Sequence, residues 1–132
     1  MSLTATLRHQ HAEMRALLED VRRHGIASAE GRQRLAKARD LIVDHLRRED
    51  AELYPALRSS VATQAIANTY ADEMQELSRE IVAFFDAYRN GGDDLAFARG
   101  FGRLLGTLNQ RWTREEVRLY PAYETHCASN AA

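Results

Sequence analysis

The chain repeats one phrase, and the repeat decides its fold: His45-Leu-Arg-Arg-Glu-Asp-Ala-Glu-Leu-Tyr-Pro-Ala-Leu57 aligns with Arg111-Trp-Thr-Arg-Glu-Glu-Val-Arg-Leu-Tyr-Pro-Ala-Tyr123 at an offset of 66 residues. Six of the thirteen aligned positions are identical, so we expect the two phrases to occupy equivalent places in two related helix pairs. A weaker alignment of His11-Ala-Glu-Met14 with Met74-Gln-Glu-Leu77 extends the relation to the other helix of each pair. The sequence therefore predicts an approximate twofold within one chain.

Apolar residues recur at three- and four-residue steps along four segments, which predicts four amphipathic helices. The first segment begins near Leu3 and stops around His24-Gly25, and the third ends near Tyr88. The second and fourth segments run up to Pro55 and Pro121. We expect each proline to end its helix or to kink the last turns, because it lacks an N–H and its ring clashes with the preceding turn.

The links between these segments are short. The strongest loop signal is Asn90-Gly91-Gly92-Asp93-Asp94, in which either aspartate could cap the following helix. Very little of the chain alternates in the manner of a strand. We therefore predict an all-α fold, an antiparallel up-down-up-down four-helix bundle that forms a single domain over residues 1–132.

The composition excludes several classes of protein. Lys+Arg 18 against Asp+Glu 19 gives a formal net charge of −1, so no overall field draws the chain to nucleic acid or to lipid headgroups. Cys127 is the single cysteine and cannot form an internal disulfide. Arg8 and His9 interrupt the first apolar residues, and no segment approaches the roughly 18 apolar residues of a membrane span. We expect a cytoplasmic protein without a nucleic-acid or membrane partner.

Side chains that interrupt the apolar stripes are the candidates for function, because a buried polar group needs a partner or a ligand. Three inward positions that correspond to one another fall in each half of the repeat: His11, His45 and Glu49, then Met74, Arg111 and Glu115. His9 and His24 lie off the stripe, and we expect them in solvent. Met14 and Met74 suit the filling of the core better than ligation.

The first three positions have the chemistry of a metal site. Two imidazoles and a carboxylate suit a borderline metal such as iron or zinc. His45 and Glu49 lie one helical turn apart, a separation of about 5–6 Å that allows both to reach one ion. The alternative is that His11 and His45 are hydrogen-bonded core residues, which is the commoner role of an isolated buried histidine.

His11, the pair His45 and Glu49, and the repeated Glu-x-x-x-Leu-Tyr-Pro-Ala phrase resemble the hemerythrin-like family, also called HHE cation-binding domains. The resemblance extends from about His9 to about Tyr123. It implies an antiparallel four-helix bundle with a non-haem di-iron centre, held by histidines of all four helices and by bridging glutamates. It also implies O₂ or NO binding, or iron or redox sensing. Carried over by position, it implies the metal ligands His11, His45, Glu49 and Glu115.

Two positions depart from the family pattern, because Met74 and Arg111 stand where it has histidines. A thioether suits Cu(I) better than iron, and arginine stays protonated and cannot ligate. We expect Arg111 to point inward beside Glu115 and near Glu49, where its charge replaces that of a second ion. The alternative is that Arg111 turns to solvent while Trp112 takes the core position.

Other polar residues of the two phrases have weaker claims. Tyr54 and Tyr120 either hydrogen-bond to the carboxylates or anchor the end of the core, and the second role is the commoner. Asp50, Glu52 and Glu116 are expected to form a solvated face.

Two functions follow from these patterns. The first is a hemerythrin-like domain that binds iron in a mononuclear or incomplete di-iron site, for O₂ or NO binding, for iron or redox sensing, or for storage. The alternative is a metal-free four-helix interaction or regulatory module, with a protein partner that the sequence does not identify, in which Arg111 replaces the metal charge. We do not expect an enzyme, because di-iron carboxylate enzymes use Glu-x-x-His pairs and no glutamate here precedes a histidine by three residues.

Overall fold

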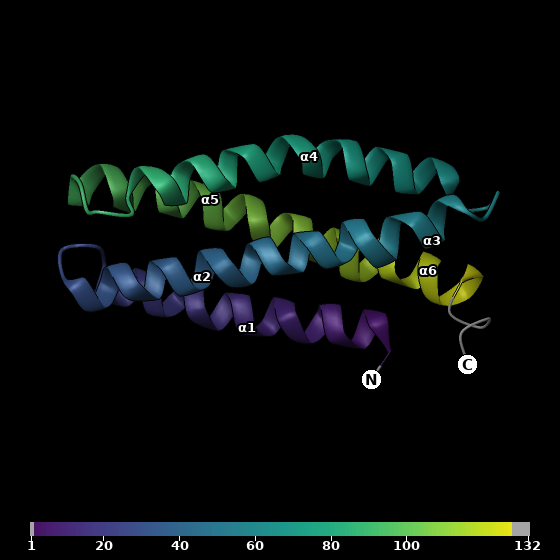
Figure 1. The fold of residues 1–132 in the computed structure, drawn as a ribbon, viewed down its shortest axis with the longest axis horizontal. Helices are drawn as coiled ribbons and strands as arrows, with labels where there is room; N and C mark the ends of the chain where they lie inside the picture. Colours follow the sequence, from purple (N-terminus) through teal and green to yellow (C-terminus); the bar gives the residue numbers. More distant parts are fainter. Residues whose placement is uncertain (1, 128–132) are drawn as a thin grey trace.

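The computed structural model, which describes residues 2–127, is an antiparallel bundle of four long helical runs (Figure 1). The runs are α1 (Leu3–His24); α2 (Ala29–Arg48) with η1 (Glu49–Leu53) and α3 (Tyr54–Arg58); α4 (Gln64–Ala87); and α5 (Asp94–Arg114) with η2 (Glu115–Leu119) and α6 (Tyr120–His126). The described part of the chain contains no strand, so the predicted all-α fold is confirmed. The domain bounds 1–132 stay a prediction, since residues 1 and 128–132 lie outside the described part.

The helices begin and end where local chemistry satisfies their free backbone groups. Ser2 caps α1 and Ser28 caps α2, each through its side-chain oxygen. Of the two aspartates that could cap α5, Asp93 does so, because its carboxylate accepts the N–H of Ala96 at 2.7 Å. Gly25 ends α1 with a φ of 67°, a left-handed conformation that glycine adopts without strain.

Of the two effects expected of the prolines, ending the helix is excluded, because the chain stays helical to Arg58 and to His126. A π turn precedes each proline: the N–H of Tyr54 donates to the carbonyl of Glu49, five residues earlier, and a matching turn follows Glu115. Each proline then sits in the first turn of a new α segment, where its missing N–H leaves no bond unmade. The two π turns therefore occupy equivalent positions in the two repeated phrases.

The core consists of two apolar clusters with a polar layer between them. On α1, Leu7 belongs to one cluster and Met14 to the other, and His11 lies between them. Met14 and Met74 both pack in the larger cluster, as the sequence predicts. The polar layer is therefore sealed at both ends by buried hydrocarbon, which removes water and strengthens every charge interaction inside it.

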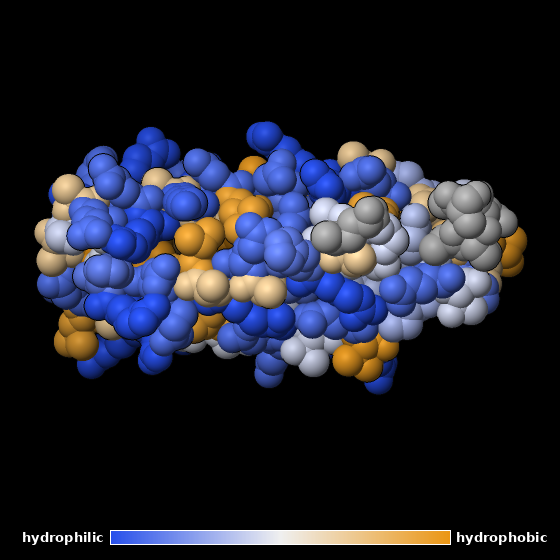
Figure 2. Space-filling model, turned by 90° about the horizontal axis from the view of Figure 1, so that it is seen from below, coloured by the Kyte–Doolittle hydropathy of each residue, from blue (hydrophilic) through white to orange (hydrophobic). Residues whose placement is uncertain are grey.

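The face of the molecule in Figure 2 is mostly hydrophilic, with separate hydrophobic spots. Across the described residues, no helix combines the length and the apolar character needed to cross a membrane. The cytoplasmic location stays a prediction.

Two glycines make a matched test of the packing. A Cβ on Gly31 would lie 1.9 Å from the carbonyl oxygen of Gly25, while a Cβ on Gly106 would meet nothing within 4 Å. We expect Gly31→Ala to lower the free energy of unfolding by about 1–3 kcal/mol or more. Gly106→Ala should raise it by up to about 1 kcal/mol, because alanine is the better helix former. Urea unfolding of both variants measures this, and equal midpoints would contradict the close approach of Gly31 to Gly25.

Candidate metal centre

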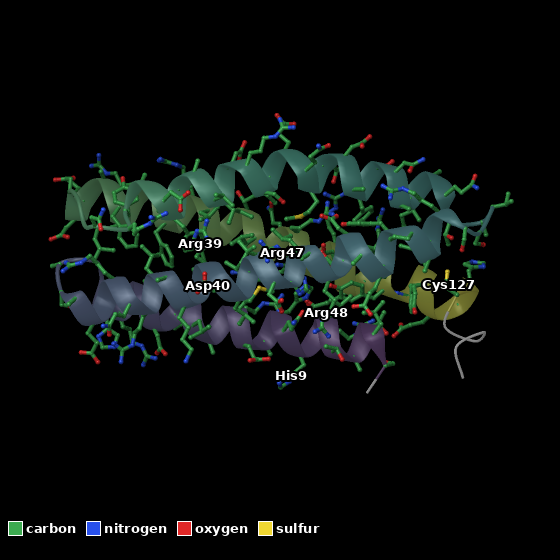
Figure 3. All side chains as sticks on the ribbon, in the orientation of Figure 1. His9, Arg39, Asp40, Arg47, Arg48 and Cys127 are labelled. Atoms are coloured by element: carbon green, nitrogen blue, oxygen red, sulfur yellow. The ribbon has the colours of Figure 1, made fainter. Side chains whose placement is uncertain are left out.

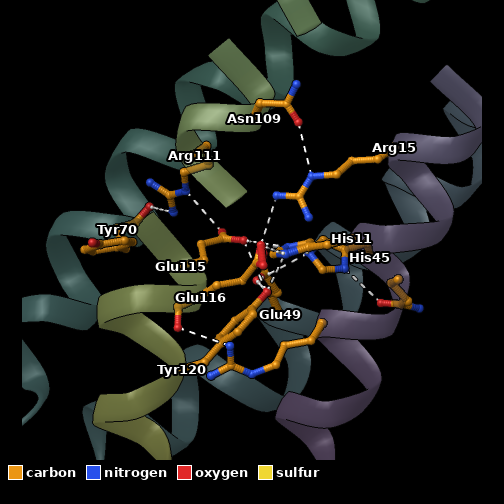
Figure 4. Close-up of polar contacts among 12 residues, drawn as sticks. His11, Arg15, His45, Glu49, Tyr70, Asn109, Arg111, Glu115, Glu116 and Tyr120 are labelled. Atoms are coloured by element: carbon orange, nitrogen blue, oxygen red, sulfur yellow. Dashed lines mark hydrogen bonds and ion pairs between the residues drawn. The ribbon is translucent and has the colours of Figure 1, made fainter. Parts of the chain in front are cut away.

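Four side chains from three helical runs meet in the polar layer: His11 from α1, His45 from α2, Glu49 from η1 and Glu115 from η2 (Figure 4). One nitrogen or oxygen atom of each lies within 4.8 Å of those of the others. None of the four is more than 1% exposed. The structure thus brings together all four residues that the family resemblance marks as ligands.

The distances among these atoms suit one metal ion. His11 Nε2 lies 3.0 Å from Glu115 Oε1 and 3.2 Å from His45 Nε2. His45 Nε2 lies 3.5 Å from Glu49 Oε2 and 4.0 Å from Glu115 Oε1. In octahedral coordination, donor atoms bound at about 2.1 Å to one ion lie about 3.0 Å apart when they are neighbours. Two donor atoms on opposite sides of the ion lie about 4.2 Å apart. The residues present therefore fit a single ion.

The outer nitrogen of each imidazole is already engaged. His11 Nδ1–H donates to Glu116 Oε2 at 3.0 Å, and His45 Nδ1–H donates to the side-chain oxygen of Gln10 at 2.8 Å. Arg15 donates to the same oxygen of Glu116 at 3.0 Å and keeps it ionised. Both rings are thereby held with Nε2 toward the cluster, which is the arrangement that outer hydrogen bonds impose on metal-binding histidines.

Tyr120 lies among the same atoms. Its hydroxyl is 2.9 Å from Glu49 Oε2, 3.1 Å from His11 Nε2 and 3.2 Å from Glu115 Oε1. The π turn explains this position, because the N–H of Tyr120 bonds the carbonyl of Glu115 and so places Tyr120 one turn directly after that carboxylate. Tyr120 therefore combines the two roles that the sequence offered as alternatives: it anchors the core and it hydrogen-bonds to a carboxylate.

The cluster holds more lone pairs than protons. The single phenolic proton of Tyr120 faces three acceptors. Glu49 Oε1 is buried and has no hydrogen-bond partner among the described residues. Buried acceptors without donors are costly, and a cation relieves that cost.

In the metal-free protein, the charges around the cluster favour a proton on His45. Burial disfavours the imidazolium of His45, but the carboxylates of Glu115 and Glu49 raise the pKa of His45 to about 9. Burial and the charge of Glu115 raise the pKa of Glu49. Burial also opposes ionisation of Glu115, yet its contacts with His11 and His45 and the charge of Arg111 hold the pKa of Glu115 well below its usual range. A metal ion would therefore compete with the proton on His45.

Arg111 points into the bundle and is 4% exposed, so the solvent-facing alternative is excluded. Its Nε donates to Glu115 Oε2 at 3.1 Å and Nη1 donates to Glu73 Oε2 at 3.1 Å. Trp112 is buried as well, with its ring stacked beside that of His11. Arg111 also lies close enough to Glu49 for the two charges to interact, as expected, but the carboxylates that accept hydrogen bonds from it are Glu115 and Glu73.

Three residues that orient the site were not predicted: Gln10, Glu73 and Glu116. The expectation that Glu116 only faces solvent is wrong, since its side chain is 26% exposed and it bonds His11. These residues lie beside the apolar stripes, where periodicity treats polar side chains as surface. The weak alignment of the first and third helices held a signal for two of them, because Gln10 and Glu73 precede the aligned His11 and Met74.

Two histidines and two glutamates that meet at one buried point inside a four-helix bundle are typical of a cation-binding helical bundle. The family model of the hemerythrin HHE cation-binding domain matches residues 2–123, and the chain belongs to this family. The predicted resemblance is thus confirmed. Among curated proteins and solved structures, none matches the chain significantly.

Proposed function

We propose that this chain is a metal-binding domain that holds one non-haem iron ion through His11, His45, Glu49 and Glu115. The observation that carries the proposal is the separation of 3.2 Å between His11 Nε2 and His45 Nε2, each on a ring whose Nδ1–H donates outward. Two facing nitrogen lone pairs repel one another unless a cation or a proton lies between them. Outer hydrogen bonds hold the pair in place whichever occupant is bound.

The donor set is compatible with iron. It contains two imidazoles, two carboxylates and a phenol within hydrogen-bond distance, and no thiolate. Such nitrogen and oxygen donors suit iron and zinc, while sulfur ligands suit Cu(I). A bound ferrous ion supplies an open coordination position where O₂ or NO can bind. We propose that the domain acts by reversible occupancy, as a sensor of iron, redox state or a diatomic gas, and not by turnover.

The residues around the cluster support reversible binding. Trp112 and Tyr120 both stack against the His11 ring, with centroid distances of 5.4 Å and 5.5 Å, and His11 is fully buried. Their packing keeps the imidazole in one orientation, so ion binding does not require the helices to rearrange.

The second candidate function is the metal-free interaction or regulatory module. One observation favours it: Arg111 and a protonated His45 together balance the buried carboxylates Glu49 and Glu115 without any ion. The two candidates differ in metal content alone, so one experiment separates them.

The test is an anaerobic titration of the full chain with Fe(II) and, separately, with Zn(II). Elemental analysis after desalting should find one iron per chain, and the melting temperature should rise because the ion binds the folded state. At a free metal concentration of 100 Kd the gain in unfolding free energy is about 2.7 kcal/mol. A chain that retains no metal and melts at an unchanged temperature is the metal-free module.

Metal affinity should depend on pH in a stated direction. The pKa of His45 is raised from 6.5 to about 9, so the metal-free protein loses a proton from His45 when an ion binds at neutral pH. The apparent affinity should then rise by about tenfold per pH unit between 6.5 and 9. As the pH rises over the same range, the metal-free fold loses the stability that the charge of His45 contributes. This contribution is complete below the unfolded pKa of the histidine. Binding isotherms across this range measure the affinity, and urea unfolding of the metal-free protein measures the stability. An affinity that does not change with pH contradicts the role of His45.

A further inference from the structure

The internal twofold generates a second half-site opposite the first. Corresponding residues are separated by 66 positions in the second and fourth helical runs and by 63 in the first and third. The corresponding pairs are His45 with Arg111, Glu49 with Glu115, Tyr54 with Tyr120, Gln10 with Glu73, and His11 with Met74. Each half-site can therefore be compared with the other contact by contact.

The contacts correspond although the residue types differ. In the first half Gln10 accepts the Nδ1–H of His45 at 2.8 Å. In the second half Glu73 accepts Nη1 of Arg111 at 3.1 Å. The carboxylates correspond as well: His45 Nε2 lies 3.5 Å from Glu49 Oε2, and Arg111 Nε donates to Glu115 Oε2 at 3.1 Å. The tyrosine contacts differ, since Tyr120 lies beside His11 and Tyr54 accepts from Arg111 Nη2 at 3.1 Å. The guanidinium thus lies in the place that corresponds to the imidazole of His45 in the first half.

In each half-site, the charge of the acceptor suits the side chain that donates to it. The neutral amide of Gln10 supports an imidazole, and the carboxylate of Glu73 supports a permanent cation. Arg111 is also bound by Glu115 Oε2 and by the carbonyl of Tyr70 at 2.8 Å, so its head group has acceptors on every side. The ring of Tyr70 lies 4.6 Å from the guanidinium carbon and adds a cation–π contact.

We infer that Arg111, held by Glu73, is a built-in cation that takes the place of a second metal ion and limits the bundle to one. The inference rests on the proposed single-ion site of the first half. Arg111 is a positioning residue: it has no lone pair to offer an ion, and it holds Glu115 Oε2 so that only Oε1 faces the two histidines. Glu115 then acts as a ligand to one ion and as a counter-ion to the arginine.

The test is the iron stoichiometry of the wild-type chain, of Arg111→His with Met74→His, and of Arg114→His as a matched control. Arg114 also bonds Glu73 and stacks on Tyr70, but its side chain is 49% exposed. We expect one iron in the wild type and in the control, and two in the double variant. Electron paramagnetic resonance of the oxidised proteins is a second measurement, since an isolated ferric ion gives a signal that coupling to a second ferric ion weakens.

All but the last of the following outcomes separate this inference from the proposed function. Two ions in the wild type overturn the inference and leave metal binding intact. One ion in a folded double variant, judged by circular dichroism, overturns it as well. If the wild type holds none and the double variant holds iron, the proposed function fails and the blocking role of Arg111 stands. If neither holds iron, both fail.

Discussion

Replacing Arg111 with methionine is expected to lower the free energy of unfolding of the metal-free protein by about 3–5 kcal/mol at neutral pH, because the change leaves a buried carboxylate without its cation. Glu115 is 1% exposed and would keep only its contacts with the histidines and with the Tyr120 hydroxyl. Methionine has a similar length and no charge, so packing changes little. Urea or thermal unfolding in the presence of a chelator measures the loss.

The charge origin of this loss has a pH signature. The pKa of Glu115 is held low in the folded protein, so its ionised form contributes stability above the unfolded pKa of 4.5 and loses it as the pH falls toward the lower folded value. Removing Arg111 raises that folded pKa, so the difference between variant and wild type should shrink below pH 4.5. Arg114→Met, a half-exposed control, should change stability by no more than about 0.5 kcal/mol. An equal deficit of Arg111→Met at neutral and acid pH would mean that packing, and not charge, is the cause.

Replacing His11 with alanine is expected to weaken iron binding by at least about 100-fold, because even the loss of an outer hydrogen bond to a ligand costs 10–100-fold. His11 Nε2 is the atom that faces His45, Glu115 and Tyr120 together. The measurement is the Fe(II) dissociation constant by titration, with folding checked by circular dichroism.

His9 is the matched control for this variant. It lies on the same helix two residues earlier, it is exposed, and it points away from the bundle (Figure 3). His9→Ala should bind iron like the wild type. If His11→Ala binds as tightly as His9→Ala, the ion is not held by the buried cluster.

Much of the candidate site followed from the repeat. Glu49 and Glu115 occupy the same place in both phrases, and both begin a π turn in the structure. His11 and His45 interrupt apolar stripes, and both are buried. The prediction that Arg111 points inward beside Glu115 was also right, because Leu108 and Glu115 define the inward face of its helix. The hydrogen bond of Arg111 with Glu73 was not predicted.

The errors have a common cause. Pro55 and Pro121 were read as helix ends from their missing N–H, and a periodicity of 3.6 contains no π turn. Each π turn adds one residue to the helix, so the residues after it point in directions that a period of 3.6 does not predict. This shift is the reason that Tyr120 reaches the cluster.

The sequence by itself determined four amphipathic helices, their order, the family, and the side chains that face inward, because helical periodicity is a property of neighbouring residues along the chain. Only the tertiary structure decided which atoms meet. The contact of His11 with Glu115 joins residues 104 positions apart, and that of Arg111 with Glu73 joins residues 38 apart. Such distances depend on how the helices pack and rotate against one another, and that is set by the whole core at once.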